Sequence, residues 1–511
     1  MTEHGLGTAA VRLRDWFQRD VENRVEAAVG GPARLRVIVL LASVLGLSTA
    51  DTATVGAIAT ELERALHIGN TDIGLLVTAS TAVGAVATLP MGLLTDRVNR
   101  TRLLWISILV WCAAMIASGA ATSFLMLLLT RLALGAVVAT AGPAVASLTG
   151  DLFPPAERGR IYGYILTGEL IGTGVGFLIS GDLAGVLSWR VGFWWLAAPG
   201  VVLAWSIRRY LPEPARGGQS RLRPGDTDIP SDRSVDRGAE PEYDGQADDD
   251  GEVEREVEDE GIRPRAGLVL QSDPTDRPLR WAIRYVLSIP TNRVLIVASA
   301  LGYFFLQGLE TFAVVFLRGR FGLGQSTAST LLVVLGLGAI LGVLIAGRIG
   351  DALIDRRHIT GRPMVAGAAF VIAAALFVPA LLTTALLVAA PLFFLAAAGL
   401  GGANPPLDAA RLDIMHSRLW GRAESVRTAL RTGLQALAPL LFGYVSTLLG
   451  GAGGGLGHPT GAQPHGAAGL DHTLLIMLVP LVAAGTLMLA RARATYPRDV
   501  ATAVASERAT A

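Results

Sequence analysis

Charged residues inside long apolar stretches are the most informative chemistry in this chain. Asp51 and Arg131 each lie in a segment otherwise dominated by Leu, Val, Ala and Gly. A charge at the centre of a bilayer costs roughly 2.5–3.5 kcal/mol on insertion scales. At about 1.5 Å per residue, both residues lie roughly 12–14 Å below the ends of their segments. Equal depth and opposite sign predict an ion pair, which is either a fixed structural salt bridge or, as we expect, a working pair that lines a pathway.

A second carboxyl, Glu310, occupies the corresponding place in the second half of the chain. Residues 51–55 align with residues 310–314, but the position that matches Arg131 is Phe393. A buried carboxyl without a basic partner favours its neutral form. We expect Glu310 to exchange protons with a pathway; the alternative is a carboxyl that only hydrogen-bonds a neighbouring backbone.

Further charges lie nearer the ends of the apolar segments. Glu169 and Arg431 are equivalent positions of the two halves, and Asp408, Arg411 and Asp413 crowd the end of one segment. Glu169 and Arg431 are candidates for substrate or proton contacts. The alternative is that charges of this kind lock the two halves together during a conformational cycle.

These residues need a scaffold of membrane-spanning helices. The chain has 511 residues, of which 51% are hydrophobic and 17% charged, a surface that water could not solvate. A spanning helix needs about 20 apolar residues. The segments that meet this requirement are 36–60, 72–94, 102–121, 124–148, 160–183, 191–211, 291–317, 326–348, 364–383, 385–409, 424–449 and 472–491. The predicted fold is therefore all-α, with twelve transmembrane helices.

Repeated motifs divide these helices into two pseudo-symmetric bundles of six. Gly92-x-x-x-Asp96 ends one apolar segment and Gly347-x-x-x-Asp351 ends another, and a basic cluster follows each. Residues 143–160 also align with residues 405–422 without a gap. The chain is therefore a duplicated membrane bundle.

The distribution of arginine predicts the orientation. Basic residues concentrate in alternate connections, which places those connections, both termini and the central linker in the cytoplasm of a multi-pass protein of the cell membrane. The expected units are a cytoplasmic N-terminal segment with an amphipathic helix (1–33), the first six-helix bundle (34–211), a disordered acidic cytoplasmic linker (212–290), the second bundle (291–492) and a cytoplasmic tail (493–511). The linker is either a solvated tether or a regulatory segment.

Several kinds of chemistry lack the residues that they need. Cys112 is the only cysteine, and the seven histidines are scattered through predicted loops and tails. We therefore expect no metal site and no cofactor. A membrane-embedded enzyme would need a nucleophile and a base, and no intramembrane His or Cys is placed to supply one, so we expect no enzyme. The net charge of +1 gives no reason to expect nucleic acid.

The run from Gly92 to Arg102 resembles the signature of the major facilitator superfamily, G-x-L-x-D-R-x-G-R-[KR]. Asn99 replaces its second glycine, and we expect a left-handed turn there, which Asn tolerates. The resemblance implies that Asp96, and more weakly Asp351, holds a gate shut together with nearby basic residues. The implied gating set is Gly92, Asp96, Arg97, Arg100, Gly347 and Asp351.

Two further runs narrow the resemblance within this superfamily. Residues 163–181 are similar to the antiporter motif g-x8-G-x3-G-P-x2-G-G, with Phe177 and Ser180 as departures. The Asp51 and Arg131 pair, the run 151–153 and Trp189-Arg190 resemble Spinster-type lipid transporters, which implies that the pair couples protons to substrate movement. Drug–proton antiporters are almost as similar.

Together these features predict a secondary active transporter that works by alternating access. We expect proton-coupled efflux of an amphipathic or lipophilic small molecule by a monomer in the lipid bilayer, because the helices carry few Asn, Gln, Ser or Thr residues to bind a sugar. The alternatives are an importer of an organic anion, drawn by Arg131 and Arg431, and a transporter-like sensor that moves nothing.

Overall fold

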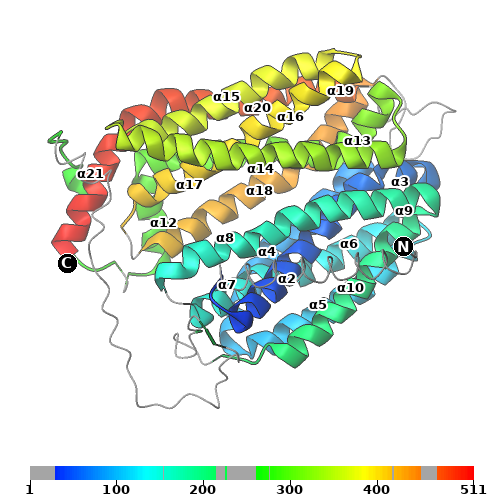
Figure 1. Ribbon diagram of the computed structural model, residues 1–511, viewed down its shortest axis with the longest axis horizontal. Coiled ribbons are helices and arrows are strands. Elements are labelled where there is room, and N and C mark those ends of the chain that lie inside the picture. The colour runs from blue at the N-terminus through cyan, green and yellow to red at the C-terminus, as the bar shows by residue number, and fades with distance from the viewer. Residues whose placement is uncertain are drawn as a thin grey trace, which may run out of the picture.

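The structure, a computed structural model, describes residues 29–153, 155–214, 222, 225–226, 260–274, 277–416, 419–450 and 469–510. All regular secondary structure within these ranges is helical (Figure 1). Twelve of the helices in the described residues are long and apolar enough to cross a membrane. The predicted all-α fold of twelve transmembrane helices is confirmed.

The N-terminal half contains α2 (Pro32–Ala57), α3 (Ala59–Leu66), α4 (Asn70–Arg97), α5 (Arg100–Gly119), α6 (Phe124–Val138), α7 (Ala141–Leu152), α8 (Pro155–Val175), the π-helical turn η1 (Gly176–Ser180), α9 (Gly181–Val186) and α10 (Trp189–Tyr210). The fourth spanning segment is broken between α6 and α7. The fifth continues from α8 through η1 into α9.

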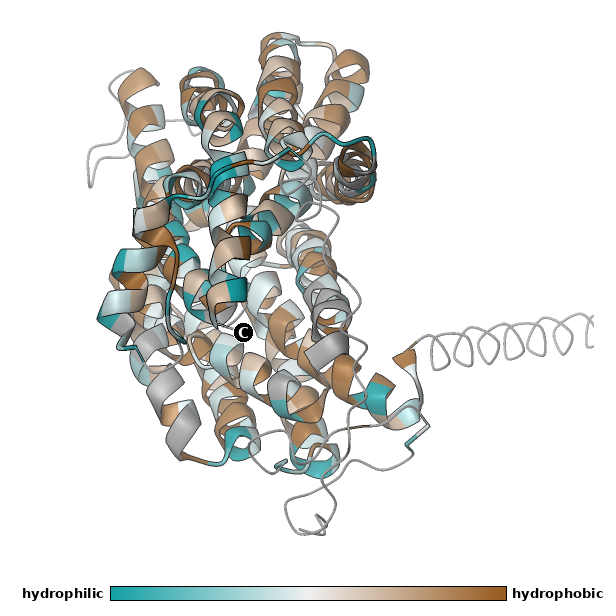
Figure 2. Ribbon diagram, turned by 90° about the vertical axis from the view of Figure 1, so that its left-hand side faces the viewer, coloured by the Kyte–Doolittle hydropathy of each residue, from teal (hydrophilic) through white to brown (hydrophobic). Residues whose placement is uncertain are grey.

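The C-terminal half contains α12 (Leu279–Ser288), α13 (Pro290–Phe321), α14 (Gln325–Asp355), α15 (Gly361–Leu382), α16 (Leu386–Gly402), α17 (Asn404–Asp413), α18 (Trp420–Leu449), α19 (Leu470–Ile476), α20 (Leu478–Leu487), the π-helical turn η5 (Met488–Ala492) and α21 (Arg493–Thr510). Many large apolar side chains on the helices are exposed, and apolar residues make up most of the helical ribbons (Figure 2). A lipid-facing surface of this kind is expected for a helical membrane protein.

Glycines bring α2 and α8 into direct backbone contact. Gly172 faces the carbonyl of Gly46, and a Cβ added at Gly176 would lie 2.6 Å from the carbonyl oxygen of Ala50. Small residues allow such close approach inside a membrane, where van der Waals packing holds helices together. We call this line of close contacts between α2 and α8 the seam. It fixes the position of Asp51, the residue that follows Ala50, along the helix axis relative to α8.

The two halves meet toward one end of the molecule, where α2 ends and α3 begins; we call it the α3 end and the opposite one the linker end. Asn70 Nδ2 donates a hydrogen bond to Ser446 Oγ at 2.6 Å, and the hydroxyls of Thr71 and Thr447 lie 2.9 Å apart. These contacts join the start of α4 to the last turn of α18.

The same end is also closed beside α3. Arg318 Nη1 of α13 lies 2.6 Å from Glu61 Oε1 of α3, and Gln325 Nε2 of α14 donates to the carbonyl of Ala57. Gly56 packs against the backbone of Glu310, since an added Cβ would lie 2.6 Å from its carbonyl oxygen. The closure therefore joins four pairs of helices from opposite halves, namely α4 with α18, α3 with α13, α2 with α14 and α2 with α13.

Part of the predicted disordered linker has a defined structure, so its expected extent, 212–290, is wrong. Within residues 260–274, Arg265 Nε pairs with Asp499 Oδ1 of α21 at 2.6 Å, and Leu270 N donates to Ser506 Oγ at 3.0 Å. The amphipathic helix α12 follows and buries Tyr285. The expected N-terminal amphipathic helix and the acidic run 240–259 lie outside the described residues.

Candidate functional site

The structure places the predicted charge pair in direct contact. Arg131 Nη1 lies 2.7 Å from Asp51 Oδ1, and the two residues are 1% and 3% exposed. Arg131 Nη2 also donates to Met115 Sδ at 3.4 Å, and its guanidinium lies 4.7 Å from the ring centroid of Phe193. Its Nε makes no hydrogen bond to any of the described residues. The two residues thus form a deeply buried ion pair between α2 and α6, and side chains of α5 and α10 pack against it.

A hydroxyl network next to the pair ties α2 to the fifth and sixth segments. Thr54 Oγ1 lies 2.7 Å from Ser180 Oγ, and Trp195 Nε1 donates to the same hydroxyl at 2.8 Å. Ser180 belongs to η1, which includes Phe177, the position at which the antiporter motif has proline. π-Helical turns are frequent at functional sites. Here the turn η1 interrupts the regular α-helix at the place where the motif has proline.

Glu310 in α13 has a different environment from Asp51. Its carboxyl has no described hydrogen bond or ion pair. Phe393, at the position equivalent to Arg131, packs edge-on against Phe316 and at a tilt against Phe377, with ring centroids 6.2 and 6.1 Å away. One turn from Glu310, Gln435 Nε2 donates to Gln307 Oε1 at 2.8 Å. The structure thus places a cationic partner beside Asp51 and an aromatic cluster at the equivalent place.

Glu169 and Arg431 belong to opposite halves, on α8 and α18, and their charges are close enough to interact. No described hydrogen bond joins them. Thr49 Oγ1 donates to the backbone carbonyl of Glu169 at 2.9 Å, and the Arg431 guanidinium lies 4.2 Å from the ring centroid of Tyr303. Both charges therefore keep their capacity for further hydrogen bonds.

A network of ion pairs joins α17 to the two turns of α18 that precede Arg431. Arg427 pairs with Asp408 at 2.7 Å and with Glu424 at 2.9 Å, and Arg411 pairs with Glu424. Sequence reasoning missed Glu424 and Arg427. Their spacing of three residues on one helix face is a signal that could have found them.

Asp413 has its described partners within the C-terminal half. Arg362 Nη1 of α15 lies 2.6 Å from Asp413 Oδ2, and the Tyr496 hydroxyl of α21 donates to the same carboxylate. Asp408 and Arg411 likewise pair with α18 of their own half. The described contacts of these three residues brace one bundle, and the expected lock between the halves stays a prediction.

The gating motif is only partly described. Gly92 and the side chains of Asp96, Arg97 and Asp351 are not described, so their predicted role stays a prediction. Gly347 lies in α14 against Pro405 of α17, whose Cβ would be 3.8 Å from an added Cβ.

The backbone at Asn99 differs from the expected left-handed turn. Its φ is −65° and its ψ is 115°, an extended conformation, and its side chain accepts a hydrogen bond from Arg102 N at 2.7 Å. Asn99 therefore caps the start of α5. The left-handed prediction was wrong because Asn is also a favoured capping residue.

Arg100 anchors the linker end of the N-terminal half. It is buried and pairs with Asp151 of α7 and, at 2.8 Å, with Glu213 Oε1, which follows α10. Its Nη1 donates to Ser147 Oγ at 3.1 Å. Burial opposes ionisation of Glu213, but hydrogen bonds from Thr101 N and Arg100 outweigh it and lower the pKa of this carboxyl. Arg100 thus fastens three chain segments together.

Comparisons with known proteins agree with this architecture. The family model of the Major Facilitator Superfamily matches residues 40–439. A bacterial homologue of the human lysosomal transporter Spinster, inward-facing and unoccupied, is similar with a TM-score of 0.73 at 20% identity, over 92% of this chain and 98% of that chain. Its occupied inward-facing structure has a TM-score of 0.68 at the same identity and coverage. The nucleoside transporter NupG has a TM-score of 0.58 at 13% identity, over 90% of this chain and 99% of that chain.

Proposed function

The chain belongs to the major facilitator superfamily, and we propose that it exports an amphipathic or lipophilic organic molecule across the cell membrane in exchange for protons. Asp51 is the proposed proton carrier and Arg131 its switchable partner. When Asp51 binds a proton, it no longer attracts the guanidinium, so the pair can open. Opening of the pair alters the packing of α2 against α6. Proton binding thus shifts the equilibrium between two packing arrangements of these helices.

The single observation that supports coupling most strongly is the asymmetry of the two halves. The pair joins two buried charges at 2.7 Å, whereas Glu310 at the equivalent place has no described partner. Buried ionisable groups in membrane bundles usually belong to pathways. Glu310 is the proposed second proton site, which assists Asp51 when the halves move.

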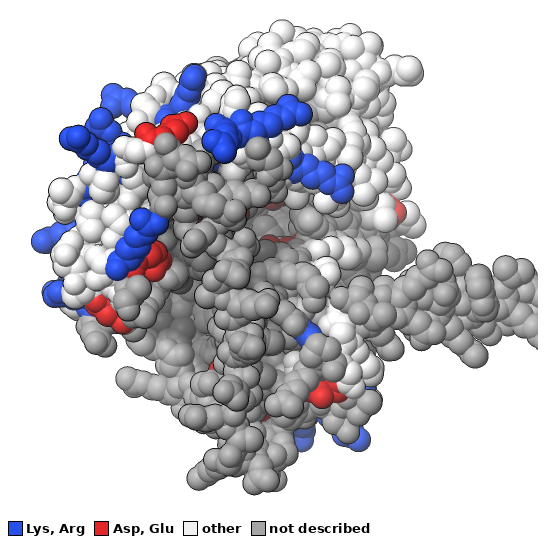
Figure 3. Space-filling model, turned by 60° about the vertical axis from the view of Figure 1, so that its left-hand side comes forward, with Lys and Arg blue, Asp and Glu red and all other residues white. Residues whose placement is uncertain are grey.

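The arrangement of the halves corresponds to one step of alternating access. Exposed basic side chains gather on the linker end (Figure 3), and those in the described residues include Arg280, Arg284, Arg356, Arg357 and Arg498. The preference of basic residues for the cytoplasmic side favours this end as the inner one. Because the halves are joined at the α3 end, we assign this structure to an inward-open state.

Proteoliposomes that contain a pH-sensitive dye test this function. A panel of lipophilic cations, lysolipids and organic anions is added under an imposed pH gradient, and proton movement is recorded. Movement evoked by a lipophilic compound in the wild-type protein and lost in Asp51→Asn supports the proposal. Equal proton movement in the variant contradicts the role of Asp51.

A second candidate, import of an organic anion, is favoured by the arginines of the C-terminal half. Arg431 has no described ion pair, and Arg427 and Arg411 lie in the adjacent network. In the same assay, an importer would accumulate the anion together with protons, and Arg431→Gln would weaken this uptake. Export of lipophilic compounds unaffected by Arg431→Gln would favour the first candidate.

A further inference from the structure

The helices α5 and α10 lie side by side along one edge of the N-terminal half (Figure 1). They run in opposite directions. Toward the α3 end, Trp194 Nε1 donates to the carbonyl of Ile116 at 3.1 Å, and toward the linker end the guanidinium of Arg208 lies 5.3 Å from the ring centroid of Trp105. The end of α10 therefore lies beside the start of α5.

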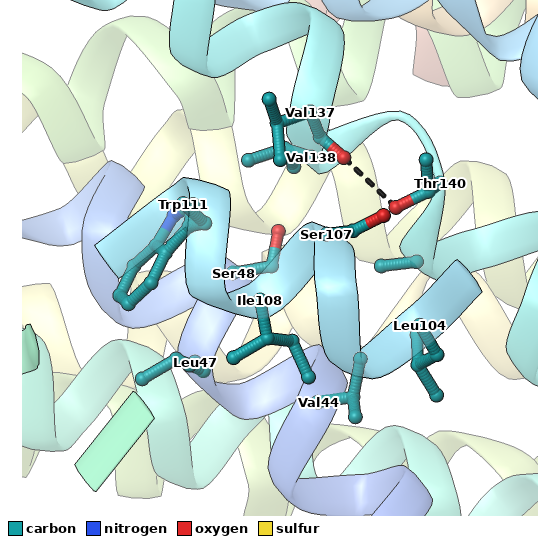
Figure 4. Close-up of a pocket in the computed structure, with 11 residues that line it drawn as sticks. Val44, Leu47, Ser48, Leu104, Ser107, Ile108, Trp111, Val137, Val138 and Thr140 are labelled. Carbon is teal, nitrogen blue, oxygen red and sulfur yellow. Dashed lines mark hydrogen bonds between the residues drawn. The ribbon is translucent and has the colours of Figure 1, made fainter. Parts of the chain in front are cut away.

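One face of α5 is turned into the bundle and the opposite face is turned away from it. Leu104, Ile108 and Trp111 line a small apolar pocket between α5, α2 and the break between α6 and α7 (Figure 4). The opposite face is exposed, and its residues include Arg102, Ile106, Leu109, Val110 and Ile116. An exposed apolar face of this size on a membrane protein is a surface for lipid.

The exposed face of α10 has the same composition. Its large apolar residues are Trp194, Val201, Val202 and Trp205, and it ends at Arg208 and Arg209. The exposed face of α5 likewise ends at Arg102, three residues before Trp105. Because Trp105 contacts Arg208, these three arginines lie within about one helical turn of one another along the axis. Both apolar faces therefore end in positive charge at the linker end.

Aromatic rings hold two of these arginines in place. Arg208 lies over Trp105, and the guanidinium of Arg209 lies 5.6 Å from the ring centroid of Tyr210. Tyr210 in turn packs edge-on against Trp205, with ring centroids 5.8 Å apart. A guanidinium that lies over a ring keeps the N–H donors at its edge available for other partners. Trp and Tyr are also the residues that favour the headgroup level of a membrane.

The positive charge of this cluster is not neutralised within the part of the chain that the structure describes. None of the three arginines makes a described hydrogen bond or ion pair through its side chain. The carboxylate of Glu213, which follows α10, and that of Asp151 pair with Arg100. Three guanidinium groups are therefore available to an anion from outside the protein.

We propose that this surface binds an anionic phospholipid, with the headgroup phosphate between the arginines of α5 and α10 and the acyl chains along the two apolar faces. Arginine binds phosphate oxygens through two parallel hydrogen bonds, and basic clusters between spanning helices recognise anionic headgroups. The apolar faces favour a lipid over free phosphate. The bound lipid fastens the end of α10 to the start of α5. This site does not depend on the proposed transport reaction, because the lipid lies on the outer surface.

Native mass spectrometry of the purified protein tests the site. The protein is titrated in detergent with phosphatidylglycerol or with phosphatidylcholine of the same acyl chains, and the lipid-bound fraction gives a Kd for each. We expect tighter binding of phosphatidylglycerol, and about thirtyfold weaker binding in the double variant Arg208→Gln/Arg209→Gln. The double variant Arg356→Gln/Arg498→Gln is the matched control. It removes two exposed arginines that have no described aromatic partner, and it should bind like the wild-type protein.

Trp105→Leu separates this site from general surface charge. It keeps every arginine but removes the ring beneath Arg208, and it should weaken binding of phosphatidylglycerol about two- to fivefold. Unchanged affinity in Trp105→Leu, equal affinity of the wild-type protein for the two lipids, or an equal loss in both double variants overturns the proposal. A dimer that forms without added lipid and dissociates in Trp205→Ser would assign the surface to a second copy of this chain, and this also overturns it.

Discussion

Removal of Arg131 should destabilise this protein more than removal of Asp51. Arg131→Ala leaves a carboxylate that is 3% exposed without its partner at 2.7 Å. Breaking a buried pair by removal of one member costs about 3–5 kcal/mol. Asp51→Asn keeps an oxygen that accepts from Arg131 and leaves the guanidinium over Phe193, so its cost is about 1–3 kcal/mol. The double variant removes both charges, and we expect it to be more stable than Arg131→Ala by about 0.5–3 kcal/mol.

The assay is thermal stability of the purified protein in detergent, read as the monodisperse fraction that remains after heating. The wild-type protein, both single variants and the double variant are compared at neutral pH. Arg190→Ala is the matched control, because Arg190 also lies over an aromatic ring and bonds a carbonyl but pairs with no described carboxylate. Losses that add in the double variant would refute the reasoning, since they would mean that the two side chains act independently.

Three further predictions concern the seam and the α3 end. Gly172→Ala should lower thermal stability by about 1–3 kcal/mol because the new methyl group overlaps backbone, whereas Gly174→Ala, on the same helix with only Val333 4.0 Å away, should be neutral; equal stability of the two variants would refute the seam. Arg318→Ala should increase the labelling of a cysteine introduced at the α3 end, because the substitution removes the ion pair between Arg318 and Glu61 of the other half. Arg320→Ala should not, since its described partners lie in its own half, and equal labelling would count against the closure. Burial raises the pKa of Glu63 in α3 to about 8, so the closed end binds a proton that an exposed carboxylate would release. Closure of the α3 end should therefore weaken, and cysteine labelling there increase, as the pH rises from about 5 to about 8. Glu63→Gln should remove this pH dependence. The same pH dependence of labelling in Glu63→Gln would contradict the role of Glu63 as the titrating group.

The twelve helices and the contact between Asp51 and Arg131 could be predicted because each follows from a quantity that the sequence states. Helix number follows from apolar segment length, and the pair follows from equal depth and opposite charge. The network of Glu424 and Arg427 could not be derived fully. Their mutual spacing is visible, but their pairing with Asp408 and Arg411 depends on how α17 packs against α18.

The linker shows how an average over composition hides a structured segment. Acidic residues dominate 240–260, and this led to the expectation of disorder for the whole connection. The last part instead contains an amphipathic helix, α12, in which Tyr285 stacks on Trp281 with ring centroids 5.3 Å apart. Aromatic residues at helical spacing can bury enough surface to order a short segment, so that part needed its own assessment.

Glycines bring helix backbones into contact both inside the N-terminal half and between the halves, where Gly74 faces the carbonyl of Pro439 and Gly56 that of Glu310. Within the N-terminal half, glycines hold α2 against α8 by backbone contact, which cannot slide without collision. Between the halves, the described residues form five hydrogen bonds at the α3 end. At about 0.5–1.5 kcal/mol net for each bond, these sum to about 3–8 kcal/mol. A ligand must supply about 5.5 kcal/mol of differential binding to move a two-state equilibrium from 1:99 to 99:1. The hydrogen bonds of the closure are therefore strong enough to hold one state and weak enough for ligand binding to release it.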